Sequence, residues 1–132
     1  MKKRGILNAE LASVVARMGH LDTLTIADAG LPIPDGPQRI ELIVKPGLPR
    51  FLDVLAVVLE ELQVESAIIA EEMIDVSPDL HRQLLEVLDG IPIAAAIPHE
   101  RFKEQTAQSK AVVRTGEFTP YANVILVAGV TF

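Results

Sequence analysis

The spacing of apolar residues predicts an alternation of helices and strands along most of the chain. Apolar residues spaced three and four positions apart predict helices over residues 8–18, 49–62 and 77–89, and Pro98 opens a shorter predicted helix over 98–108. Two-residue alternation and short apolar runs predict strands over residues 21–27, 39–44, 67–70, 91–97, 111–114 and 123–131. Caps and breakers agree with these boundaries: Ser77 precedes Pro78 at one helix start, and Gly19 and Gly90 follow helix ends.

The order of these elements predicts the class of fold. Strands alternate with helices through most of the chain, which is typical of a three-layer α/β/α protein with a mainly parallel central sheet. The last two strands are joined by the short turn 115–120, so we expect them to form an antiparallel pair. No linker, repeat or low-complexity segment interrupts the pattern, and we expect residues 1–132 to form one domain.

Composition limits the partners that the chain is expected to have. Of the 132 residues, 49% are hydrophobic and only 4% aromatic. A small domain this apolar is expected to cover part of its surface by self-association. The net charge of −6 argues against a nucleic-acid or anionic-membrane surface, and the absence of cysteine excludes disulfides and thiol chemistry. No apolar run approaches the length of a membrane span, and we expect a cytoplasmic protein.

Two residues able to handle protons bracket the first predicted strand. His20 stands just before it and Asp28 at its end, followed by Gly30 and a proline-rich turn. A histidine after a helix-ending glycine is often only a cap, and an aspartate before Gly-x-Pro is often only a turn former. Taken alone, these residues favour that structural interpretation, and they need support from elsewhere in the chain.

His99 follows the strand 91–97, where it could serve merely as the cap of the next helix. In open α/β sheets, ligands bind beyond the carboxyl ends of the strands, so Asp28 and His99 are expected at the same edge. His20 lies at the other end of its strand and is expected on the order of 20 Å from Asp28 if the strand is extended. Either the chain bends here, or a neighbouring subunit completes the site.

The only tyrosine, Tyr121, lies in the turn before the last predicted strand, and an asparagine, Asn123, begins that strand. A tyrosine hydroxyl, an asparagine amide and exposed backbone groups in a turn form a good surface for sugar hydroxyls, although both residues could be purely structural. The chain contains no G-x-G-x-x-G, P-loop or G-x-S-x-G motif, and its three histidines lack the spacing of metal ligands.

Two long motifs resemble those of the D-ribose pyranase family, which is related to the fucose mutarotases. They cover residues 19–34 and 114–126, and the similarity extends along the whole chain, including residues 99–103. Two motifs at the expected separation are far more specific than a single pair of residues. The resemblance is weakest over residues 63–89, where the pattern of apolar and polar positions is kept more than the residues themselves.

The resemblance implies both a function and an assembly. It implies interconversion of the pyranose and furanose forms of ribose, which feeds a kinase that uses the furanose. It also implies ring-shaped homo-oligomers, typically two stacked pentamers, with the site between subunits. By position, His20 is implied as the proton donor, and Asp28, His99, Tyr121, Ala122 and Asn123 as sugar-binding residues. No metal or organic cofactor is implied.

Alternatives remain open at this point. The same fold could act on another aldose such as fucose, and the shape of the pocket would decide between the sugars. A third possibility, from another class, is a sugar-binding or regulatory module without catalytic activity. Such a module would not accelerate exchange between the forms of the sugar.

Overall fold

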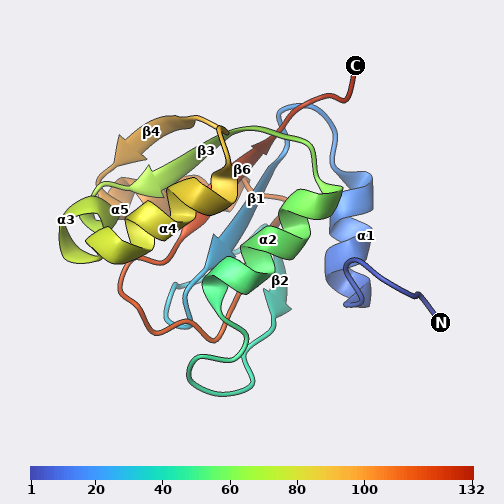
Figure 1. The fold of residues 1–132 in the computed structure, drawn as a ribbon, viewed down its shortest axis with the longest axis horizontal. Helices are drawn as coiled ribbons and strands as arrows, with labels where there is room; N and C mark the ends of the chain where they lie inside the picture. Colours follow the sequence, from blue (N-terminus) through green and yellow to red (C-terminus); the bar gives the residue numbers. More distant parts are fainter.

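Six strands form one mixed sheet in the computed structural model, which describes residues 1–132 (Figure 1). The strands are ordered β2-β5-β1-β6-β3-β4 across the sheet. In chain order the elements are α1 (Ala9–Arg17), β1 (Thr23–Ala27), β2 (Gln38–Glu41), α2 (Phe51–Glu61), β3 (Val64–Ala70), α3 (Glu72–Val76), α4 (Pro78–Leu88), β4 (Ile93–Ile97), α5 (His99–Gln105), the 3₁₀ turn η1 (Thr106–Gln108), β5 (Ala111–Arg114) and β6 (Val124–Ala128).

The sheet is mostly parallel, as predicted. β5 pairs parallel with both β1 and β2, and β3 pairs parallel with β4. β6 is the exception, because it lies antiparallel between β1 and β3. The predicted antiparallel pair of the last two strands is wrong: β5 and β6 run in opposite directions, but β1 lies between them. The turn that connects them therefore crosses the end of β1, which brings its residues to the carboxyl end of that strand.

Helices cover both faces of the sheet, which gives the three layers expected of the fold. The larger core cluster joins one sheet face to the buried sides of α1, α2 and α4, with side chains such as Leu11, Leu55 and Leu84. The smaller cluster lies on the other face, where Phe102 of α5 packs against Val112 and Ile125. Figure 1 shows α2 and α4 in front of the sheet, and none of the helices is long and apolar enough to cross a membrane.

Local chemistry accounts for several element boundaries. Asn8 caps α1 by accepting the backbone N–H of Leu11 at 2.9 Å. α4 begins with Pro78 and ends before Asp89, which adopts a left-handed conformation with a φ of 45°. The sequence pattern missed one element, the five-residue helix α3. A helix this short has too few positions to show a periodic stripe, so spacing could not reveal it.

Candidate functional site

Asp28 and Asn123 form a reciprocal hydrogen-bonded pair at the carboxyl end of β1. The backbone N–H of Asp28 donates to Asn123 Oδ1 at 2.9 Å, and Asn123 Nδ2 donates to Asp28 Oδ2 at 3.0 Å. The other carboxylate oxygen of Asp28 accepts the N–H of Gly30 at 2.9 Å. Asn123 is fully buried, so its side chain is held in one orientation. Each Asp28 oxygen keeps a lone pair with which it can accept a hydroxyl from a ligand.

His99 and Tyr121 form an aromatic wall beside this pair. Their rings meet edge to face, with centroids 5.0 Å apart and an interplanar angle of 80°. The His99 ring also stacks on buried Phe102, with the ring centroids 6.3 Å apart. Tyr121 has a φ of 62°, a left-handed conformation that is uncommon for a side chain of this size. Local strain of this kind persists where surrounding contacts hold it, and it is frequent at functional sites.

These residues line one hollow at the edge of the sheet. A cavity of about 290 Å³ is bordered by Asp28, Gly30, Leu31, Pro32, His99, Pro120 and Tyr121. An adjoining cavity of about 330 Å³ shares Asp28 with it and extends over Glu117 and Phe118. The expected common edge for Asp28 and His99 is therefore present in the structure. The carboxylate acceptor and the aromatic residues in this lining form a surface suited to a polyhydroxylated ring.

His20 does not reach this hollow. It lies in the turn that precedes β1, at the opposite end of that strand from Asp28. The turn is closed by Asp22, whose carboxylate accepts the N–H of Gly19 at 2.9 Å. This backbone hydrogen bond, assisted by Lys110, lowers the pKa of Asp22 below its usual range. The chain does not bend here to bring His20 and Asp28 together within one subunit.

Glu65 on β3 forms a close contact with His20. His20 Nε2 lies 3.0 Å from Glu65 Oε2, and both side chains are partly exposed. An ionised carboxylate only accepts hydrogen bonds, so this contact places a proton on Nε2 and leaves Nδ1 free to exchange one. The strand pairing shifts register between Val64 and Ser66, where Glu65 lies, and such irregularities redirect side chains.

Sequence reasoning missed Glu65 and two further residues near the hollow, Glu72 and Ser77. Both oxygens of the Glu72 carboxylate accept the backbone N–H of His99, at 3.0 and 2.9 Å. Ser77 Oγ donates to the carbonyl oxygen of Pro120 at 2.7 Å. One signal was available for Glu72, because it comes two residues after a buried strand, where ligands bind. The predicted strand 67–70 began too late to include Glu65.

Another cavity is larger but chemically different. It measures about 560 Å³, lies between α1, α2 and the segment 42–49, and most of its lining residues are hydrophobic. It lacks the converging polar groups that recognition of a sugar requires, so we assign the candidate site to the hollow beside Asp28. No group of three or more His, Asp or Glu side chains is arranged to hold a metal ion.

The fold and the hollow together define a class: an α/β protein with a small polar site beyond the carboxyl ends of its strands. The chain belongs to the RbsD / FucU transport protein family, whose model matches residues 1–131. Two curated relatives are the D-ribose pyranases of Photobacterium profundum and Geobacillus kaustophilus. The first is 53% identical, with all of both chains covered, and the second is 52% identical, covering all of this chain and 96% of the relative.

Solved structures support the same assignment. The structure of Bacillus subtilis RbsD complexed with D-ribose is 51% identical, covers all of both chains and superposes with a TM-score of 0.95. The fucose mutarotase of Streptococcus pneumoniae in complex with L-fucose has a TM-score of 0.74, covering 96% of this chain and 95% of that one. At 22% identity, the second likeness shows the fold alone.

Proposed function

We propose that this protein is a mutarotase that interconverts the pyranose and furanose forms of D-ribose. The observation that carries the proposal is the full-length match to Bacillus subtilis RbsD complexed with D-ribose, at 51% identity and a TM-score of 0.95. The D-ribose pyranase relatives at 52% and 53% identity add to it. A reaction that uses only the furanose, such as its phosphorylation, benefits from faster exchange.

Ring opening requires two proton movements. The bond between C1 and the ring oxygen breaks, the ring oxygen gains a proton, and the anomeric hydroxyl loses one to become the aldehyde. We propose that protonated His20 gives a proton to the ring oxygen from Nδ1, while Nε2 stays hydrogen-bonded to Glu65. Water accepts the anomeric proton. Positioned acid–base help of this kind is worth about 10²–10⁴-fold in rate.

Ring closure reverses these movements through a different hydroxyl. The 4-hydroxyl oxygen attacks C1 and loses its proton to His20 Nδ1, while the aldehyde oxygen regains a proton from water. The sugar ends one ring size smaller, and His20 and water recover their starting states. Neither a covalent intermediate nor a change of oxidation state is needed, and the proposal includes no metal or organic cofactor.

Sugar binding is assigned to the hollow. Asp28 accepts sugar hydroxyls with the oxygen lone pairs that its intramolecular bonds leave free. The rings of His99 and Tyr121 provide a wall for the C–H face of the sugar. Ala122 lies between Tyr121 and Asn123 and is fully buried, so we propose that it contributes by holding these two neighbours in place. The side chain of Asn123 is engaged with Asp28, and we propose that it acts by orienting that carboxylate.

We also propose that the working form is a ring-shaped homo-oligomer, for which two stacked pentamers are the expected arrangement. His20 is remote from the hollow in one subunit, and a neighbouring subunit's His20 would complete the site. Uncovered apolar surface supports association: Leu7, Val44 and Phe118 are exposed, and the side chains of the edge strand β4 are aliphatic. We place this assembly in the cytoplasm, with which the cysteine-free sequence is compatible.

One experiment tests this function. Saturation-transfer NMR on D-ribose, with and without protein, measures exchange between the pyranose and furanose signals. We expect protein-dependent exchange with ribose and slower exchange with fucose at equal concentrations. Faster exchange with fucose or another aldose would reassign the substrate. Equal rates with and without protein for every sugar would mean a binding module without catalytic activity.

A further inference from the structure

The short helix α3 contacts the candidate site from both of its ends, and we propose that it positions the two rings that form the sugar-binding wall. The inference rests on the proposed function, because it takes His99 and Tyr121 as sugar-binding residues. It adds two positioning residues, Glu72 and Ser77. Neither lines the cavities beside Asp28, so each acts through another residue.

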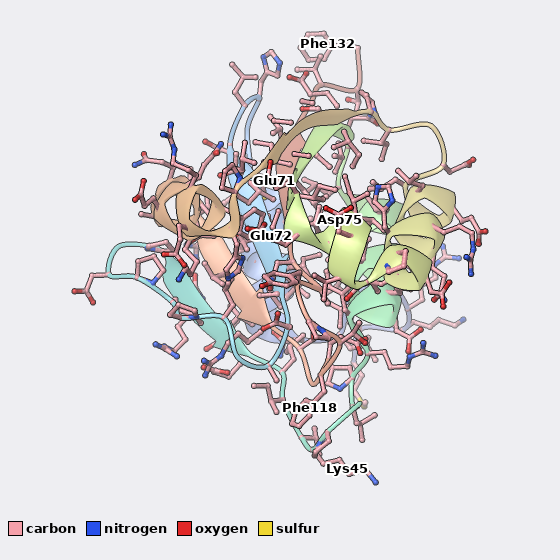
Figure 2. All side chains as sticks on the ribbon, turned by 90° about the vertical axis from the view of Figure 1, so that its left-hand side faces the viewer. Lys45, Glu71, Glu72, Asp75, Phe118 and Phe132 are labelled. Carbon is pink, nitrogen blue, oxygen red and sulfur yellow. The ribbon has the colours of Figure 1, made fainter.

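The side chain of Glu72 holds the backbone of His99. β3 pairs with β4 in a register that places Ala70 opposite Ile97, so α3 begins where β4 ends. From there, both carboxylate oxygens of Glu72 accept the N–H of His99. Hydrogen bonds to an ionised acceptor are about twice as strong as neutral ones. Figure 2 shows Glu72 beside Glu71 and Asp75, the two exposed acids of the same segment.

Ser77 holds Tyr121 from the other end of α3. Its side chain is buried, and its hydroxyl donates to the carbonyl oxygen of Pro120 at 2.7 Å. That carbonyl belongs to the peptide that joins Pro120 to Tyr121, the residue with a φ of 62°. A left-handed conformation at a bulky residue needs outside contacts to persist. The Ser77 bond is one such contact, and it acts directly on the strained peptide.

The two contacts together set the separation of the rings. His99 and Tyr121 come from different segments of the chain, and each is attached to an end of the five-residue helix α3. The centroid distance of 5.0 Å therefore depends on the length of α3 and on its two hydrogen bonds. Loosening either bond lets one ring move relative to the other, which lowers the affinity for the sugar. The proton transfer by His20 is unchanged.

The maximal rate and KM together distinguish a positioning role from a merely structural one. A variant that only destabilises the fold lowers the fraction of active protein, so its maximal rate falls while KM stays constant. A variant that loosens the wall raises KM and leaves the maximal rate almost unchanged. We expect Glu72→Ala to raise KM for ribose about tenfold, the effect of losing one charge-assisted hydrogen bond. Glu72→Gln keeps one acceptor oxygen and is expected to raise KM only about threefold.

The experiment measures saturation-transfer rates as a function of ribose concentration for the wild type, both Glu72 variants, Ser77→Ala and Ser77→Thr. Ser77→Thr keeps the hydroxyl and is expected to bind ribose better than Ser77→Ala. Asp75→Ala is the matched control, because it removes an exposed carboxylate from the same helix. The His99 backbone amide proton gives an independent readout: its NMR signal should move upfield in Glu72→Ala and much less in Glu72→Gln.

Two results would overturn the proposal: a lower maximal rate at unchanged KM in Glu72→Ala, or a Glu72→Ala variant that matches Asp75→Ala. If Glu72→Ala fails to fold, Glu72→Gln and Ser77→Ala provide the same comparison. His99→Ala separates this inference from the proposed function. If His99→Ala leaves KM unchanged, the sugar-binding role of His99 is wrong. If it raises KM and the Glu72 and Ser77 variants do not, only the role of α3 is wrong.

Discussion

The carboxylate of Asp28 and the amide of Asn123 hold each other through two hydrogen bonds, although 95 positions separate them in the chain. Asp28 follows β1, and Asn123 precedes β6, the strand that pairs antiparallel with β1. The end of one strand and the start of its partner must then lie side by side. The antiparallel placement of β6 therefore creates the polar corner of the hollow.

Replacing the catalytic candidate tests the assigned chemistry first. We expect His20→Ala to abolish protein-dependent exchange of ribose while the protein stays folded, because His20 is exposed and outside both core clusters. Saturation transfer measures the rate, and circular dichroism checks the fold. His81→Ala on α4 is the control and should keep normal exchange. A folded His20→Ala protein with near-normal exchange would refute the role of His20.

Asp28→Asn should weaken ribose binding about tenfold, because the change removes a charged acceptor of the sugar hydroxyls. The variant also puts an amide N–H₂ where an oxygen now accepts from Gly30 or Asn123, so one of these bonds is lost. Isothermal titration calorimetry measures the affinity. Unchanged affinity in a folded variant would remove Asp28 from the site.

Asn123→Ala should weaken binding and also destabilise the fold. A turn position suggests little cost in stability, but Asn123 is fully buried, and its loss leaves polar groups of Asp28 without partners. We expect a loss of about 1–3 kcal/mol in the free energy of unfolding. Urea denaturation measures it. An unchanged unfolding midpoint would show that water replaces the amide.

Glu65→Ala should lower the exchange rate about tenfold and leave the affinity for ribose unchanged, because His20 loses the acceptor that selects its tautomer. Nitrogen-15 NMR of the imidazole should show a loss of preference for a proton on Nε2. Glu60→Ala, which removes an exposed carboxylate from α2, is the control. If Glu65 acts through His20, the rate and the tautomer preference of the imidazole are lost together in Glu65→Ala. A lower rate with an unchanged tautomer preference would contradict that.

Mixing two inactive proteins tests whether subunits share the site. After reversible dissociation, His20→Ala and Asp28→Ala chains are mixed and reassembled. Some interfaces then carry both intact residues, and partial recovery of exchange is expected. Size-exclusion chromatography with light scattering gives the mass of the assembly. A stable and active monomer would defeat the proposal of a shared site, and an active oligomer without recovery would show that His20 and Asp28 serve different sites.

What the sequence determined by itself is the set of elements and the chemistry they carry. Local spacing identified the long helices, and β5 was predicted with its observed bounds, Ala111–Arg114. Spacing succeeds there because a side chain's direction depends on its near neighbours along a helix or strand. The same reasoning indicated that Asp28 and His99 share one edge of the sheet, because parallel strands end together.

Tertiary structure decided which residues meet. Three kinds of contact join distant segments: the pairing of β6 with β1 and β3, the contact of His20 with Glu65, and the hydrogen bond from His99 to Glu72. No local period encodes such contacts, because they depend on strand order and on one register shift near Glu65. The hydrogen bonds that orient the site residues form only in the folded chain, because packing of the whole sheet brings their donors and acceptors together.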